Sequence, residues 1–450
     1  MEQRENKMGV MPVGKLLLNM SLPIMLSMLI MALYNVVDSI FVAMISEQAL
    51  TAVSAAFPIQ NLMIAVSTGT GVGLNALISK SLGEKKFDEA STLAKNGLFL
   101  AVCSYIVFLI VGIFFVRPFF HSQTTNPEII EQGVQYATIV SVLSFGVFGQ
   151  IAFERIMQST GKTIYTMITQ ITGAVINMIL DPIFIFVFKM GVAGAAFATV
   201  LGQIVAMFVA AWLNHRNNHE IKLDFKGFRP SVKHIGKIYA IGVPSIIMAS
   251  IGSVMYYGVN KILMAMNETA GAVFGVYFKL QSFVFMPVFG LNNGIIPIIG
   301  YNYGAANRKR IMKAYRLGLI YAITVMALGC LIFQFATPWL LKIFSASEQM
   351  MEIGIPALRT ISYCFIFAAV GIVTSSLFQA FGRGVASMIT SITRQLVVLL
   401  PAAYLLSLSG NVNYVWWSFP ISESVALVLI LILFANIYNK VIKHIPDGRE

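Results

Sequence analysis

Residues 21–46 read SLPIMLSMLIMALYNVVDSIFVAMIS, an apolar run whose only charged side chain is Asp38. About 20 apolar residues are enough for one helix to cross a bilayer, so this run predicts a membrane span. The rest of the chain has the same character, because 57% of its 450 residues are hydrophobic and only 11% are charged. A soluble domain carries about 25% charged residues. The composition therefore excludes a water-exposed globule and indicates a multi-pass α-helical membrane protein.

Apolar runs separated by charged or turn-rich breaks predict twelve spans, and so an all-α integral membrane protein. Their approximate ranges are 16–45, 50–79, 96–116, 133–153, 164–188, 192–213, 238–266, 271–300, 317–341, 354–380, 385–408 and 413–438. An even number of spans places both termini on one side, where the loops hold 24 Lys and Arg against five on the other side. Basic loops stay in the cytoplasm. We therefore expect cytoplasmic termini and a place in the plasma (inner) membrane, and the net charge of +12 reflects topology rather than nucleic-acid binding.

The chain repeats itself at an offset of 221 residues without gaps. The matched pairs include Pro23 with Pro244, Gly69 with Gly290, Gly73 with Gly294, and Gly161 with Gly382. This register predicts two pseudo-symmetric lobes of six helices, an N-lobe over 1–214 and a C-lobe over 238–450, joined by a basic cytoplasmic linker over 215–237. Six is an even number, so the two repeats are parallel. Transporters commonly contain such repeats, with the substrate site between the halves.

Few of the 19 acidic residues fall in or at the ends of the predicted spans, and these are Asp38, Glu154, Asp181 and Glu423. An acid at mid-helix costs about 2.5–3.5 kcal/mol on insertion scales, so it usually faces an aqueous cavity and has a function. Counted from the predicted helix ends at 1.5 Å per residue, Asp38, Asp181 and Thr199 lie about 10–12 Å below the outer surface. Asn177 lies one turn deeper, on the same helix face as Asp181.

These four residues, Asp38, Asn177, Asp181 and Thr199, predict one polar layer in the N-lobe. Their oxygens are hard ligands that suit Na⁺, and two close carboxylates are also able to hold a proton. At the 221 offset they fall opposite Val259, Val398, Ala402 and Pro420, so the predicted cation site belongs to one half. The alternative is that each aspartate caps or hydrogen-bonds within a kinked helix, since Asp181 precedes Pro182.

A second group of residues is a candidate lining for a substrate cavity: Tyr34, Tyr136, Gln281, Arg394 and Glu423. Tyr34 lies one turn before Asp38, and Tyr136 begins a span at a similar depth. A position in the interfacial aromatic belt is an equal alternative for Tyr136. Three single cysteines in apolar runs, without a histidine cluster, give no reason to expect a cofactor or a structural metal.

Several motifs resemble those of the multidrug and toxic compound extrusion (MATE) transporters over nearly the whole chain. They are the opening run over 21–46, TGTGVGLNALISKSLGEKK over 68–86, QSTGKT over 158–163, INMILDPIFIF over 176–186 and GVAGAAFATVLGQ over 191–203. The resemblance is strongest to the bacterial MepA-like members, with an N-lobe similar to the DinF-like branch.

This resemblance implies two six-helix lobes and the exchange of Na⁺ or H⁺ for bulky, often cationic drugs and dyes. It also implies that Asp38, Asn177, Asp181 and Thr199 bind the coupling cation and that Tyr136 lies near that site. The chain departs from the NorM-like branch, which carries acids in helices 7 and 10, because neither helix has an acid in its interior here. A cation site in the C-lobe is therefore not expected.

The sequence thus predicts a secondary antiporter that exports hydrophobic organic cations in exchange for H⁺ or Na⁺ and acts as a monomer surrounded by membrane lipid. The alternative within the same superfamily is a flippase for a lipid-linked oligosaccharide or another lipid, but its pyrophosphate would need more interior Lys and Arg. An intramembrane aspartyl protease would need a GxGD motif, whereas Asp181 lies in MILDP. We therefore do not expect an enzyme.

Overall fold

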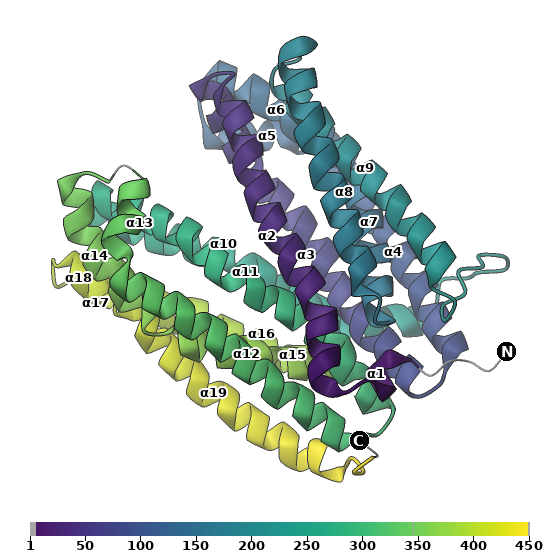
Figure 1. Cartoon of the computed structure of the whole chain (residues 1–450). Coiled ribbons are helices and arrows are strands. Elements are labelled where there is room, and N and C mark those ends of the chain that lie inside the picture. The colour runs from purple at the N-terminus through teal and green to yellow at the C-terminus, as the bar shows by residue number, and fades with distance from the viewer. Residues whose placement is uncertain (1–5, 345, 449–450) are drawn as a thin grey trace. The chain divides into compact units, whose positions relative to one another are not determined.

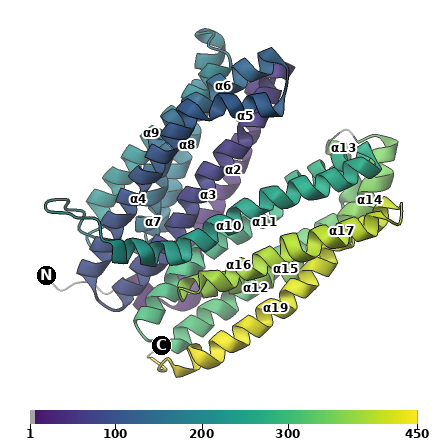
Figure 2. The same cartoon turned by 180° about the vertical axis from the view of Figure 1, so that it is seen from behind.

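The protein is almost entirely helical (Figures 1 and 2). The computed structural model describes residues 6–344 and 346–448, and within these ranges ten helices are long and apolar enough to cross a bilayer. Two further spans are helix pairs bent by 45°, α6 (Pro127–Val142) with α7 (Phe145–Ser159) and α14 (Glu348–Ser362) with α15 (Phe365–Ala380). Counting each bent pair as one span gives twelve, so the predicted all-α membrane fold is confirmed.

The remaining spans follow the predicted order. In the first half they are α2 (Val13–Ala43), α3 (Glu47–Gly83), α4 (Phe87–Phe114), α8 (Thr163–Pro182) with the π-helix η1 (Ile183–Val187), and α9 (Val192–Asn217). In the second half they are α10 (Val232–Met266), α11 (Glu268–Gly304), α12 (Arg308–Phe335), α16 (Gly384–Ile392) with the π-helix η2 (Thr393–Leu399) and α17 (Leu400–Ser407), and α18 (Val412–Val415) with α19 (Ser418–Lys440). Shorter helices are α1 (Lys7–Val10), α5 (Val116–Gln123), α13 (Thr337–Ile343) and η3 (Ile442–His444).

The repeat is visible in the backbone as well as in the sequence. Helices α3 and α11 begin and end at positions that correspond at the 221 offset, and so do α4 and α12. Left-handed backbone conformations recur in the same register, with φ of 84° at Gly161 and 76° at Gly382, and 59° at Lys85 and 52° at Ala306. The turns between the helices are therefore duplicated together with the helices.

The helices pack into two compact units. The N-unit holds Asn6 and residues 26–246, and the C-unit holds residues 7–25 and 247–448. Helices α2 and α10 therefore begin in one unit and continue into the other, and the change follows Met25 and Ile246, which correspond at the 221 offset. These packing units differ from the lobes drawn from the repeat, because residues 7–25 pack with the C-unit and residues 215–246 with the N-unit.

Glycines on the surfaces of α3 and α11 explain why the first part of α2 packs in the C-unit and the first part of α10 in the N-unit. A Cβ atom added to Gly73 would lie 2.3 Å from Ile238 O, and one added to Gly69 would lie 2.6 Å from Ile246 N, so α10 contacts α3 backbone to backbone inside the N-unit. The repeat mate of Gly69 makes the equivalent contact inside the C-unit, where a Cβ on Gly290 would lie 2.7 Å from Met25 Cα of α2. Any larger side chain would hold these helices apart.

Polar contacts at repeat-related positions also hold the segments that enter each unit from the other half of the sequence. In the C-unit, Arg310 donates through Nη2 to Met8 O (3.0 Å) and Met11 O (2.6 Å) at the start of the chain. In the N-unit, its repeat mate Glu89 accepts from Nζ of Lys237 (3.0 Å) in the first turns of α10. Arg310 thus binds α1 and the turn before α2, whereas Glu89 binds the first turns of α10, so both residues contact a segment from the other half of the sequence.

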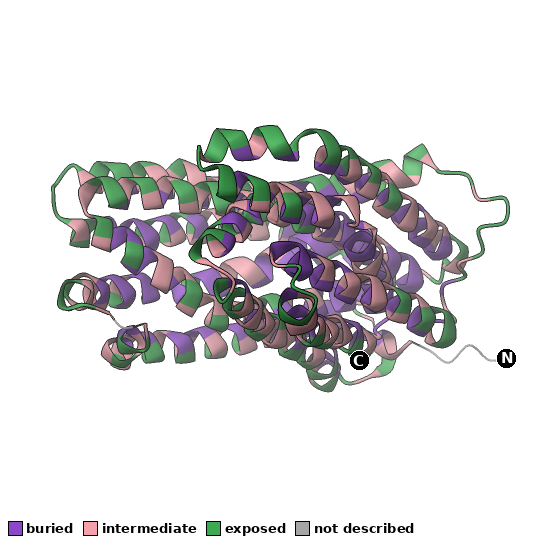
Figure 3. Ribbon diagram, turned by 90° about the horizontal axis from the view of Figure 1, so that it is seen from above, coloured by how far each residue is buried: buried purple, intermediate pink, exposed green. Residues whose placement is uncertain are grey.

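The outer faces of the helices are apolar, as lipid contact requires. On α4, side chains four residues apart remain exposed, and they are Val102, Ile106, Ile110 and Phe114. Figure 3 shows the same alternation along many helices, with buried residues on one side and exposed residues on the other. A helix that exposes an apolar stripe of this length has lipid rather than water as its solvent.

We expect Gly73→Ala to destabilise the protein, because its methyl group would overlap the Ile238 carbonyl and overpacking costs about 1–3 kcal/mol. The matched control is Gly236→Ala on α10, where nothing lies within 4 Å of the new Cβ. Removing a helical glycine there should stabilise by about 0.5–1 kcal/mol. The measurement is the melting temperature of each purified variant in detergent. Equal changes of melting temperature in the two variants would show that the close contact between Gly73 and Ile238 does not stabilise the packing of α10.

Candidate functional site

The predicted cation-site residues come from three helices of the N-unit. Asp38 lies on α2, Asn177 and Asp181 on α8, and Thr199 on α9. The chain reverses between α8 and α9 at Gly191, whose φ of 56° few other residues adopt. The four residues thus lie on neighbouring helices of one unit.

Two glycines allow α8 and α9 to approach closely. A Cβ on Gly202 would lie 2.7 Å from Gly173 O and 3.3 Å from Asn177 Cβ. This contact lies one turn below the polar residues of both helices. It brings the short side chains of Asn177 and Thr199 together, and Asn177 Nδ2 donates to Thr199 Oγ1 at 3.1 Å.

Asp38 and Asp181 lie within hydrogen-bonding reach of each other. Tyr34 and Tyr136 both interact with Thr199 and Asp38, so the tyrosines predicted for the cavity adjoin the predicted cation-site residues. The four residues that the sequence places at similar depth therefore do lie close together in the structure.

Asp38 is half-buried and the other three residues are buried, and within the described chain the buried carboxylate and amide oxygens of the site lack donors. Asp181 is 0% exposed, Asn177 2% and Thr199 5%. Among the described residues, no group donates a hydrogen bond to Asp38 Oδ1, Asn177 Oδ1 or either carboxylate oxygen of Asp181. Nor do the contacts of the two aspartates in that part of the chain include a Lys or Arg. A buried carboxylate without a partner is costly, and such a cluster of acceptors suits a bound cation or a shared proton.

The backbone next to Asp181 is also irregular. Pro182 has no N–H, and the π-helix η1 follows it, with Phe188 N donating to Ile183 O at 2.9 Å. π-helical turns inside α-helices are frequent at functional sites. The alternative prediction is that Asp181 only hydrogen-bonds to the backbone of a kinked helix. Its two carboxylate oxygens accept no backbone hydrogen bond in the described structure, so this alternative is not supported.

The other cavity candidates lie in the C-unit. Arg394, in η2, donates through Nη1 to Glu423 Oε1 of α19 at 3.0 Å. Gln281 is a half-buried residue of α11. Its repeat mate Gln60 has a contact that the sequence did not predict, because Gln60 Nε2 donates to the Tyr136 hydroxyl at 3.1 Å. The sequence feature that could have pointed to Gln60 is its correspondence with Gln281 at the 221 offset.

Glu154, another interior acid of the N-unit, has a different environment. Its carboxylate, 3% exposed, accepts hydrogen bonds from three neutral side chains on α7 and α8. The donors are Gln150 Nε2 (2.9 Å), Thr169 Oγ1 (2.8 Å) and Gln170 Nε2 (2.9 Å). This carboxylate is satisfied by the protein, whereas those of Asp38 and Asp181 are not.

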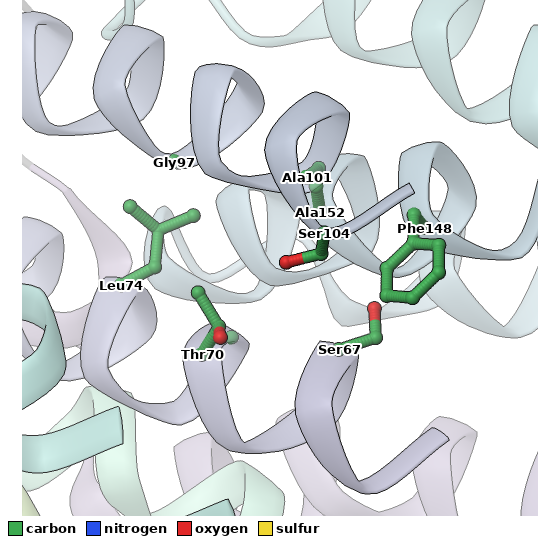
Figure 4. A pocket seen from close by; sticks show the side chains of 9 residues that line it. Ser67, Thr70, Leu74, Gly97, Ala101, Ser104, Phe148 and Ala152 are labelled. Carbon is green, nitrogen blue, oxygen red and sulfur yellow. The ribbon is translucent and has the colours of Figure 1, made fainter. Parts of the chain in front are cut away.

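Two hollows in the N-unit do not offer a site for an organic cation. One, between α3, α4 and α7, is lined by hydroxyls of Ser67, Thr70 and Ser104 (Figure 4). Its volume of about 10 Å³ barely admits a water molecule. The other, of about 380 Å³, lies beside Tyr239 and has no charged residue in its lining.

The family model described as MatE matches residues 23–183 and 233–405. The chain belongs to the MatE family. Its similarity to curated relatives spans nearly the full length: it is 23% identical to the multidrug export protein MepA of Staphylococcus haemolyticus and 24% identical to MepA of Staphylococcus aureus strain MRSA252. The alignments cover 95% and 94% of this chain and 94% of each relative.

A solved structure agrees with this family. The outward-facing conformation of a multidrug resistance MATE family transporter of the MOP superfamily matches with a TM-score of 0.92 and 25% identity, over 98% of this chain and 99% of that one. The MATE resemblance seen in the sequence is therefore confirmed, and the chain is a multi-pass membrane transporter rather than an enzyme.

We expect Asp181→Asn to raise the melting temperature in Na⁺-free detergent at alkaline pH. The amide would donate to Asp38 and remove an unpaired carboxylate, a gain of about 1–3 kcal/mol. Glu154→Gln is the matched control with the opposite sign, because its amide would face three donors and leave one of them unpaired. Loss of stability in both variants would contradict the absence of donors at Asp181.

Proposed function

We propose that this MATE transporter is a secondary antiporter that exports hydrophobic organic cations, such as drugs and dyes, in exchange for H⁺ or Na⁺. The observation that carries the proposal is the pair formed by the half-buried Asp38 and the buried Asp181. The two carboxylates lie within hydrogen-bonding reach and have no basic partner in the described chain. Two curated relatives bear the name multidrug export protein, which supports drugs as the class of substrate.

The cation would bind at Asp38 and Asp181, with Asn177 and Thr199 as further oxygen ligands in the case of Na⁺. Its positive charge neutralises the carboxylates and changes how the second part of α2 packs against α8. A cationic substrate needs the same negative charges, so the ion and the substrate exclude each other. This competition is what couples the two movements.

The available driving forces are sufficient for modest accumulation against a gradient. One unit of pH difference supplies about 1.4 kcal/mol per proton. A membrane potential supplies about 2.3 kcal/mol per charge for each 100 mV. The proposal includes a monomer in the plasma membrane with both termini in the cytoplasm, supported by the distribution of Lys and Arg among the loops.

We predict that Asp38→Asn abolishes gradient-driven efflux of ethidium from proteoliposomes. The amide keeps the shape of the side chain but removes the charge that attracts the coupling cation. We expect a loss of at least about tenfold, which corresponds to ~1.4 kcal/mol. The control is Asp88→Asn, because Asp88 is an exposed carboxylate at the start of α4.

Efflux that remains intact in Asp38→Asn would remove the N-unit site from the coupling mechanism. A wild-type protein that moves no dye under either a pH or a Na⁺ gradient would instead favour the lipid-linked oligosaccharide flippase.

A second variant, Thr199→Val, separates the two ions. Valine keeps the volume but removes the hydroxyl, so Na⁺ loses an oxygen ligand while a proton still has both carboxylates. We predict that Thr199→Val reduces Na⁺-driven efflux by at least about tenfold, or ~1.4 kcal/mol, and leaves H⁺-driven efflux nearly unchanged. The measurement compares the two imposed gradients in the same proteoliposome preparation. An equal loss under both gradients would mean that Thr199 supports the fold of the site and does not bind the ion.

A further inference from the structure

Part of the linker between the two halves of the sequence presents exposed basic side chains. This basic loop (residues 222–233) carries one acid, Asp224, and four exposed basic residues, Lys222, Lys226, Arg229 and Lys233. None of the four basic side chains forms a salt bridge or a hydrogen bond within the described chain. Asp224 is engaged inside the loop, because its Oδ1 accepts from the backbone N–H of Lys226 at 2.9 Å. The basic loop thus presents a net positive charge.

The basic loop is held against one face of α4, inside the N-unit. Ser91 Oγ accepts from a backbone N–H of the loop at 3.0 Å, and Nζ of Lys95 donates to a backbone carbonyl of the loop at 3.0 Å. Further along α4, the ring of Phe99 lies 6.5 Å from that of Phe228. Residues four apart share a face of an α-helix, so these three contacts fix the loop along a single stripe of α4.

The same stripe of α4 continues into the lipid-facing residues. Beyond Phe99 it consists of the exposed apolar side chains that begin at Val102 and end at Phe114. Phe99 and Val102 are three residues apart, which is about 4.5 Å along the helix axis. The polar headgroup layer on each side of the hydrocarbon core is about 5–8 Å thick. The basic loop therefore lies at the depth where hydrocarbon gives way to lipid headgroups.

Helix α9, which leads into the linker, marks the same boundary. Its exposed side chains at four-residue spacing change from apolar to interfacial to charged, with Phe208 62% exposed, Trp212 54% exposed, and Arg216 exposed. The Arg216 guanidinium lies 5.4 Å from the centre of the Trp212 ring. Tryptophan is enriched at the level of the headgroups. The chain thus leaves the hydrocarbon near Trp212, shortly before the basic loop begins.

An aromatic side chain extends the basic loop toward the hydrocarbon. Phe225 is 50% exposed, and its ring lies 5.7 Å from that of Phe228, which contacts Phe99. Position 320 on α12 corresponds to Phe99 at the 221 offset, and there Ile320 is 56% exposed. The covered stripe with its basic and aromatic side chains is therefore a feature of the N-unit.

Exposed positive charge and an exposed ring at headgroup depth match one class of partner. Basic segments next to membrane spans are attracted to anionic lipids. A soluble acidic protein would match the charge, but it would not match a ring beside the lipid-facing stripe. We propose that the basic loop binds the headgroups of anionic phospholipids, with the Phe225 ring at the edge of the hydrocarbon. In the proposed orientation these lipids belong to the cytoplasmic leaflet.

The test is lipid binding to the purified full-length protein in detergent, followed by native mass spectrometry. The two lipids are dioleoyl phosphatidylglycerol, which is anionic, and dioleoyl phosphatidylcholine, which has the same acyl chains and no net charge. We expect the wild type to bind phosphatidylglycerol more tightly. The double variant Lys226→Gln with Arg229→Gln should weaken phosphatidylglycerol by at least about tenfold, or ~1.4 kcal/mol, and leave phosphatidylcholine unchanged.

The matched control removes the same charge elsewhere. It is the double variant Lys261→Gln with Lys342→Gln, which changes two exposed lysines outside the basic loop. We expect it to leave both lipids unchanged. If the two double variants weaken phosphatidylglycerol equally, the attraction comes from the net charge of the protein, and the proposal is overturned.

A third variant tests the aromatic contact. Phe225→Ser should weaken both lipids by a similar factor, because the ring meets the apolar edge of the lipid whatever its headgroup. A loss confined to phosphatidylglycerol would contradict the place assigned to the ring. Soluble glycerol phosphate should not displace phosphatidylglycerol at an equal concentration, since it lacks acyl chains. Displacement would reveal a phosphate site in place of a lipid site.

Equal binding of the two lipids by the wild type would also overturn the proposal, as would a preference that survives in Lys226→Gln with Arg229→Gln. Both double variants and Phe225→Ser change exposed side chains, so their melting temperatures should remain those of the wild type. Lipid binding needs no ion gradient and no drug. The result therefore stands apart from the efflux experiments, and rejection of antiport would leave the lipid site unaffected.

Discussion

The cost of placing a charge inside a bilayer governs how this transporter arranges its few interior ionisable groups. That cost is about 2.5–3.5 kcal/mol for a mid-helix acid on insertion scales, and the chain meets it in three ways. Glu154 accepts three hydrogen bonds from neutral side chains, and Glu423 pairs with Arg394. Asp38 and Asp181 have neither kind of compensation in the described structure. The uncompensated pair marks the place where a cation from outside the protein has the most to contribute.

Helix packing decides which of these arrangements is available in each half. In the N-unit, Gly173 and Gly202 allow α8 and α9 to touch, and the polar residues one turn above are brought within 3.1 Å. In the C-unit the corresponding positions carry Arg394 and Glu423, so a charged pair occupies the space that backbone contact closes in the other half. One duplicated framework thus supports two different polar sites, because the helix geometry was kept while the side chains at its contacts changed.

Much of this architecture was predictable from the sequence, and the reasons are physical. Span lengths follow from bilayer thickness, and the constant rise of an α-helix made the depths of Asp38, Asp181 and Thr199 countable from their helix ends. The change of unit at Met25 and Ile246 was not predictable, because it depends on which glycine faces meet in space. The contact of Gln60 with Tyr136 joins residues 76 apart in the chain. The π-helices and the partner of Arg394 likewise depend on tertiary packing, which a single sequence does not encode in a local pattern.

The two polar sites also differ in what they are able to recognise. Asp38 and Asp181 present negative charge alone, because no Lys or Arg is among their contacts in the described residues. In the C-unit, the positive charge of Arg394 pairs with Glu423 at 3.0 Å. The second half therefore holds a pair of opposite charges, whereas the first half holds two carboxylates without a basic partner in the described residues. These opposite charges stand at the positions where the first half has the close glycine contact between α8 and α9.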